Sequence, residues 1–150
     1  MRPLLPFVLL AALAGCDGNP KPLVKSDAKG EPGRVRVLHV LIPFKGAKDA
    51  AATVTRTHDE AEVLAKEILG RAQRGEDFNK LIKEFSSDKG AGTYSIANHG
   101  FPAHGPEKRR TELVKAFSKL AFSLGVGEIG LAPYHSVDSP YGFHVIKRIE

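Results

Sequence analysis

The sequence lacks several features that would place it in a specialised class of protein. It has a single cysteine, so the chain cannot form an internal disulfide, and its 150 residues are enough to bury a core without one. The apolar run at residues 4–13 is too short to cross a bilayer, because a membrane-spanning helix needs about 20 residues. With 42% hydrophobic and 26% charged residues, the composition is that of one ordinary globular domain.

Nucleic-acid binding and metal binding both lack the patterns that they usually require. The net charge is +5, but no basic run is interleaved with aromatic residues, and the tight basic cluster at residues 108–110 is typical of a solvated helix start. The six histidines include no His-x-x-x-His pair, and His99, His104 and His135 are expected in loops. We therefore expect no nucleic-acid partner, no metal and no other cofactor.

The first residues have the pattern of an export signal. Arg2 precedes the apolar run, which ends in Leu13-Ala14-Gly15-Cys16. This ending resembles the lipobox of bacterial lipoproteins, in which small residues precede the cleavage point and a cysteine thiol carries the lipid. The resemblance implies lipidation of Cys16 and a location in the cell envelope, on the periplasmic face of the inner or outer membrane. The alternative is a coincidental cysteine in an ordinary signal.

The sequence divides into three parts. Residues 1–15 are predicted to be a lipoprotein signal peptide. Residues 16–33 are rich in glycine, proline and lysine and have few apolar side chains, so we expect a flexible tether. Residues 34–150 are predicted to form one folded domain.

Alternating apolar residues predict strands at both ends of this domain. Residues 34–42 form one such pattern and residues 141–149 the other, and each carries a histidine, His39 and His144, within an apolar run. A short strand is also expected at residues 129–132. Because strand side chains alternate, His39 shares a face with Val35 and Val37, and His144 shares one with Ile146.

Helical periodicity predicts three helices between these strands. Thr57 with Glu60 fits a capping box at the start of the first helix, and Asp77 is suited to cap the second. The third is expected over residues 107 to about 122, whereas residues 86–106 are expected to be irregular. The fold class is therefore α+β, with helices packed on a small, mostly antiparallel sheet.

Several short strings, in order over nearly the whole domain, resemble one known family. They comprise the apolar run around His39, Gly-Glu-Asp-Phe at 75–78 before Phe-Ser-Ser-Asp at 85–88, Ala-Phe-Ser-Leu at 121–124 before Gly-Glu-Ile at 127–129, and Tyr-Gly-Phe-His-Val-Ile-Lys at 141–147. Together they are similar to the parvulin-type (PpiC-like) peptidyl-prolyl cis–trans isomerases. The resemblance implies a parvulin-like fold and isomerase activity.

The resemblance also implies which residues are catalytic. The two core histidines of the family correspond to His39 and His144, its acidic or cysteine position to Asp88, and its hydroxyl position to Ser139. On this hypothesis the histidines pair across the sheet and join Asp88 and Ser139 in one hydrogen-bond network. The alternative is structural, because histidines in strands are often core residues and Asp88 and Ser139 are suited to turns.

Substrate binding is expected at aromatic residues. Phe117 corresponds to the aromatic wall of the proline pocket, with Phe122 or Phe101 expected beside it, although Phe117 would also suit an ordinary helix core. The family's glycine-rich motif is incomplete at residues 90–96, where its pocket leucine would be Thr93 and its aromatic residue Ile96. Lys45, Lys48 and Arg56 are interpreted as solvated surface.

The expected function is isomerisation of Xaa–Pro bonds, which assists the folding of exported proteins. The reaction makes and breaks no bond and has to lower a rotational barrier of about 18–20 kcal/mol, which a dry pocket achieves by non-covalent stabilisation of the twisted amide. The expected partners are unfolded or nascent proteins that contain proline and, through the lipid anchor, the membrane. The alternatives are a weakly active or inactive parvulin-fold chaperone or binding module, and a purely structural lipoprotein.

Overall fold

The computed structural model describes residues 30–150. The predicted signal peptide, Cys16 and most of the predicted tether lie outside the described residues. Within the described part, none of the helices combines the length and the apolar character needed to cross a membrane.

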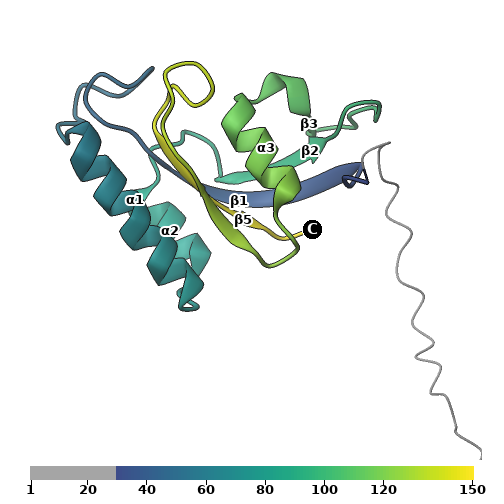
Figure 1. The fold of residues 1–150 in the computed structure, drawn as a ribbon, viewed down its shortest axis with the longest axis horizontal. Coiled ribbons are helices and arrows are strands. Elements are labelled where there is room, and N and C mark those ends of the chain that lie inside the picture. The colour runs from purple at the N-terminus through teal and green to yellow at the C-terminus, as the bar shows by residue number, and fades with distance from the viewer. Residues whose placement is uncertain (1–29) are drawn as a thin grey trace, which may run out of the picture.

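A five-stranded sheet forms the centre of the domain, in the order β3-β2-β1-β5-β4 (Figure 1). β1 (Arg34–Ile42) lies in the middle and pairs antiparallel with β2 (Thr93–Ala97) and with β5 (Phe143–Arg148). β4 (Ile129–Ala132) pairs antiparallel with β5, whereas β3 (Lys108–Arg109) pairs parallel with β2. The predicted α+β class with a mostly antiparallel sheet is confirmed, and the two strands that carry the histidines are neighbours.

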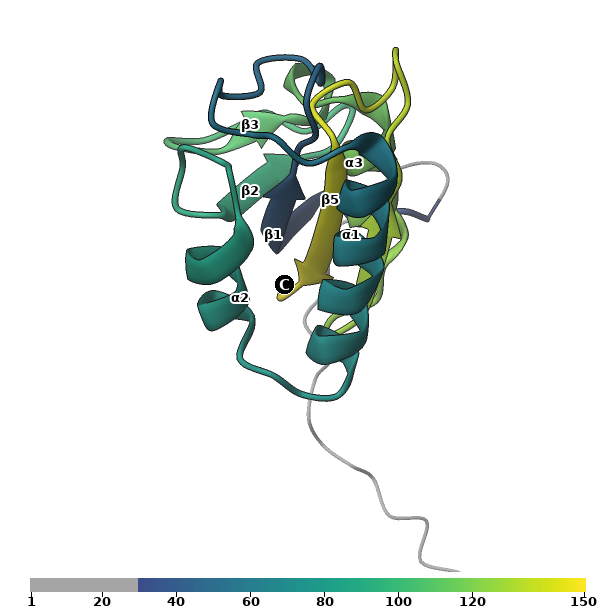
Figure 2. The ribbon, with the colours of Figure 1, turned by 90° about the vertical axis from the view of Figure 1, so that its left-hand side faces the viewer.

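Two helices, α1 (His58–Gln73) and α2 (Phe78–Phe85), cover one face of the sheet (Figure 2). Both begin as the sequence predicts: Thr57 and Glu60 form the capping box of α1, and the Asp77 carboxylate accepts from the backbone N–H of Asn79 at α2. Their apolar stripes pack against alternate residues of the two central strands. The core on this face includes Val40, Ile42, Ala65, Ile68, Leu81 and Val145.

The third helix, α3 (Lys115–Ser123), lies on the opposite face of the sheet (Figure 1). Val35 and Val37 of β1 and Ile146 of β5 are buried beneath it. His39 and His144 alternate with residues of the first core, so both point to the α3 side, where they are 3% and 5% exposed.

Residues 86–114 differ from the sequence-based expectation. The segment expected to be irregular contains β2, and the predicted helix over 107–122 is wrong in its first half, which forms β3 and the 3₁₀ turn η1 (Arg110–Glu112). Lys108 and Arg109 lie opposite Ile96 and Ala97 in the sheet. Pairing with a distant strand therefore overrides the local helical pattern, and the glycines around β2 hide its short strand signal.

Candidate active site

A cavity of about 390 Å³ lies on the α3 side of the sheet, where β1 ends and β5 begins. Two loops, residues 43–57 and 133–142, meet at this end (Figures 1 and 2), and the backbone N–H of Lys48 donates to the carbonyl of Pro140 at 2.9 Å. The central lining residues are His39, Leu41, Asp88, Tyr94, Leu113 and Phe117. The cavity therefore combines an apolar wall with a single imidazole–carboxylate pair.

Asp88 is held beside β1 by the segment that follows α2. The backbone N–H of Ser87 donates to the carbonyl of Leu41 at 2.9 Å, and the hydroxyl oxygen of Ser86 accepts from the N–H groups of Leu41 and Asp88 at 3.1 and 3.3 Å. In this position one Asp88 oxygen, Oδ2, lies 2.9 Å from Nε2 of His39. An ionised carboxylate only accepts hydrogen bonds, so Nε2 carries the proton.

Phe117 closes the site from the side of α3. Its ring meets His39 edge-on, with centroids 5.2 Å apart, and meets His144 at 5.4 Å. The two imidazoles are stacked with centroids 5.8 Å apart. The predicted pairing of His39 and His144 across the sheet therefore takes the form of ring stacking beneath Phe117.

The protonation states follow from burial and from the His39–Asp88 contact. The hydrogen bond from His39 holds the pKa of Asp88 below its ordinary value, against the opposing effect of burial. Burial lowers the pKa of His144 to about 3, assisted by the charge of His39. At neutral pH the site thus holds an ionised Asp88 and a neutral His144.

Ser139 is fully buried but makes its hydrogen bond within its own turn. Its hydroxyl donates to the carbonyl of Gly142 at 3.0 Å, and its backbone pairs with that of His135. Among the described residues, no hydrogen bond joins Ser139 to His39 or His144. The structure therefore brings His39, Asp88 and His144 together and assigns Ser139 to the loop that borders the cavity.

The aromatic residues named from the sequence separate into two groups. Phe117 lines the cavity, whereas Phe101 and Phe122 are not among its lining residues. Phe101 lies in a turn after β2, and Phe122 is buried in the core with the guanidinium of Arg110 over its ring at 4.4 Å. Thr93 and Ile96 are not lining residues either.

Two lining residues, Tyr94 and Leu113, were missed in the sequence. Tyr94 lies opposite Val37 in the sheet and shares its face, so it takes the pocket position expected for Thr93. Recognising β2 as a strand would have revealed it. Leu113 lies in extended backbone between η1 and α3, so its place in the lining beside Phe117 depends on the path of this connection and not on helical spacing. Lys48 is exposed as expected, but it also lines the cavity rim and lies over the ring of Tyr141.

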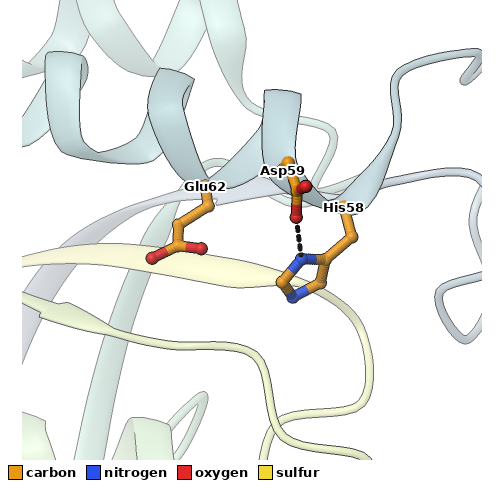
Figure 3. A group of neighbouring side chains, drawn as sticks. All are labelled: His58, Asp59 and Glu62. Carbon is orange, nitrogen blue, oxygen red and sulfur yellow. Dashed lines mark hydrogen bonds and ion pairs between the residues drawn. The ribbon is translucent and has the colours of Figure 1, made fainter.

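One group of side chains away from the cavity has donors of the kind that bind metals. His58, Asp59 and Glu62 lie at the start of α1, with ligand atoms within 4.8 Å of one another (Figure 3). These side chains already interact with other protein groups: Nδ1 of His58 is 3.0 Å from Oδ1 of Asp59, and the Glu62 carboxylate accepts a hydrogen bond from the Lys66 ammonium at 2.6 Å. The positive end of the helix dipole also disfavours a cation there. We therefore assign no metal role to this group.

Comparison with known proteins identifies the family of this domain. The family model of the PPIC-type PPIase domain matches residues 22–150. The foldase protein PrsA of Geobacillus kaustophilus is 40% identical over 87 residues, which are 57% of this chain and 27% of that protein. The foldase protein PrsA of Bacillus subtilis is 28% identical over 127 residues, which are 85% of this chain and 34% of that protein.

A solved structure shows the same fold. The peptidyl-prolyl isomerase ESS1 from Candida albicans matches with a TM-score of 0.59 and 24% identity, over 84% of this chain and 66% of that one. The chain spans about a third or less of the length of the PrsA relatives named above. The family match covers the whole described domain, so the predicted family is confirmed: the chain belongs to the PPIC-type peptidyl-prolyl isomerase (PPIase) domain family.

Proposed function

We propose that this chain catalyses cis–trans isomerisation of Xaa–Pro bonds in unfolded exported proteins and so assists their folding. The observation that supports it best is the cavity itself, in which Phe117, Tyr94 and Leu113 form an apolar wall beside the His39–Asp88 pair. An apolar wall suits a proline ring, and the carboxylate supplies a fixed charge close to it. Membership of the family gives the reaction type.

The proposed mechanism uses the electronic difference between a planar and a twisted amide. Resonance places negative charge on the carbonyl oxygen of a planar amide, and twisting the bond removes it. With the proline ring held against Phe117, an ionised Asp88 near the rotating carbonyl destabilises the planar form relative to the twisted one. His39 fixes the orientation of Asp88, and the neutral His144 supports His39 without adding a competing charge.

A refolding assay tests this function and separates it from passive binding. We expect catalytic amounts of the protein to accelerate the proline-limited phase of an unfolded protein, which otherwise takes tens to hundreds of seconds. The variant Asp88→Asn with Phe117→Leu should lose this acceleration and remain folded. Equal acceleration by the variant would refute the assignment of the site. Suppressed aggregation without acceleration by either protein would instead favour the chaperone-like binding module.

We also propose that a lipid on Cys16 anchors the domain in the cell envelope. Support comes from the Leu13–Cys16 pattern and from the direction of β1, which starts at Arg34 and carries the chain to the cavity at its other end. The described domain therefore begins at the end of β1 that lies away from the cavity. In a bacterial host, we expect Cys16→Ala to move the protein from the membrane fraction to the soluble fraction; retention in the membrane would contradict lipid anchoring.

A further inference from the structure

Tyr94 lines the cavity, and the strand pairing of β2 and two ring contacts fix the position of its side chain. It lies on β2 opposite Val37, half-buried, with its ring directed to the α3 side of the sheet. The ring meets His39 edge-on with centroids 5.1 Å apart, and meets Phe117 with centroids 5.9 Å apart. The phenyl part of Tyr94 is therefore one side of the same aromatic group that holds His39 in place.

The hydroxyl of Tyr94 reaches the carboxylate at the centre of the site. It donates to Oδ2 of Asp88 at 3.3 Å, and this is the same oxygen that accepts from Nε2 of His39 at 2.9 Å. Two donors from two neighbouring strands, β2 and β1, thus converge on one carboxylate oxygen. Such convergence restricts rotation of the carboxylate and fixes the direction in which Asp88 presents its charge to the cavity.

We propose that Tyr94 is a positioning residue of the isomerase site, in which its ring completes the apolar wall and its hydroxyl orients and stabilises the ionised Asp88. This inference rests on the proposed function. The two parts of the side chain have separable tasks, because a phenylalanine would keep the ring contacts with His39 and Phe117 and lose only the contact with Asp88.

The groups around Asp88 determine whether loss of the Tyr94 hydroxyl raises or lowers the pKa of the Asp88 carboxyl. The pKa of Asp88 is lowered first by the hydrogen bond from His39 and, against the opposing effect of burial, by the charge of His39, the backbone N–H of Gly90 and last the Tyr94 hydroxyl. Burial and then the Asp88 charge raise the pKa of Tyr94. His144 lies behind His39, and the other charged groups along the cavity are Lys48, Asp49, Lys89 and Glu112. None of these is altered by Tyr94→Phe, so the variant should raise the pKa of Asp88 and leave the other charges in place.

The test compares Tyr94→Phe with the wild type in two measurements on the full chain. In peptide isomerisation, we expect kcat/KM at neutral pH to fall about three- to tenfold, mainly through kcat, because one hydrogen bond to a charged group is lost and the ring is kept. The acid limb of the pH profile should move to higher pH. In carbon NMR of labelled aspartate, the Asp88 carboxyl should titrate at higher pH than in the wild type.

The matched control is Tyr134→Phe. Tyr134 packs against Phe44 with centroids 4.8 Å apart, on the α1 and α2 side of the sheet, and is not among the residues lining the cavity. Its variant also loses one phenol hydroxyl but should match the wild type in both measurements. Unchanged titration of Asp88 in Tyr94→Phe, or an unmoved acid limb, would overturn the proposal.

The two measurements also separate this inference from the proposed function. If the folded wild type does not isomerise any Xaa–Pro peptide, the proposed function fails. The Asp88 titration then still decides whether Tyr94 holds the carboxylate, because that measurement needs no catalysis. If the wild type is active and Tyr94→Phe equals it at every pH, the function stands and the role of Tyr94 is refuted.

Discussion

Replacing Phe117 by leucine is expected to reduce kcat/KM for Xaa–Pro isomerisation by about tenfold to a hundredfold, with the fold retained. Phe117 is 3% exposed, lines the cavity and makes ring contacts with His39, Tyr94 and His144. Leucine keeps most of the apolar volume, so the core should lose only about 1–2 kcal/mol of stability. It has no flat face for the proline ring, and it removes the ring contact of Phe117 with each imidazole, although His39 keeps its contact with Tyr94. Peptide kinetics together with thermal unfolding measure the two effects separately.

The control for this prediction is Phe85→Leu. Phe85 ends α2 on the other face of the sheet, is partly buried and has the guanidinium of Arg71 over its ring at 4.9 Å. The Phe85→Leu variant should lose some stability but keep the kcat/KM of the wild type. If both variants lose activity in proportion to their stability, Phe117 is a core residue and not a wall of the substrate site.

Gly142→Ala is expected to have the largest effect on stability, about 3–5 kcal/mol, with loss of the folded protein at moderate temperature. Gly142 has φ +136°, and a Cβ there would lie 2.4 Å from the carbonyl oxygen of Ile42 and 2.8 Å from Cα of Pro43. Both are backbone atoms, which have no room to move away because Ile42 pairs with Phe143 in the sheet. Chemical denaturation of the variant and the wild type gives the change in the free energy of unfolding.

A second glycine provides the comparison. Gly127 has φ +88°, but a Cβ there would meet nothing within 4 Å. Gly127→Ala should therefore lose only the conformational preference of glycine, about 1–2 kcal/mol. A similar loss at both positions would mean that the close approach of Gly142 to β1 has no special role in the domain.

Much of this domain follows from local sequence patterns. Alternation places His39 and His144 on the face that α3 covers, and the capping residues Thr57 and Asp77 mark the starts of α1 and α2 correctly. These features depend on neighbours within a few residues, where periodicity and capping chemistry act. The resemblance to the parvulin family adds Asp88, which no local pattern singles out.

The errors lie where long-range pairing decides the structure. β2 is short and flanked by glycines, and β3 exists only because it pairs with β2. Tyr94 was not predicted to line the cavity because β2 was not predicted as a strand. The alternation of Tyr94 with Ile96 along β2, and its pairing with Val37, place the Tyr94 side chain on the cavity side of the sheet. The expected hydrogen bond between Ser139 and the histidines likewise depended on tertiary structure: the hydroxyl donates to the carbonyl of Gly142, three residues on, in the turn that was the alternative for this residue.

The most direct test of the account is a measurement of cis–trans exchange in a proline-containing peptide. NMR exchange spectroscopy follows the cis and trans signals of the peptide in the presence of substoichiometric amounts of the full chain. The account predicts exchange signals between the two isomers that appear only with the protein and weaken strongly with Phe117→Leu. Peptide binding without any exchange, by a protein shown to be folded, would contradict it and leave a domain that holds proline-containing chains without isomerising them.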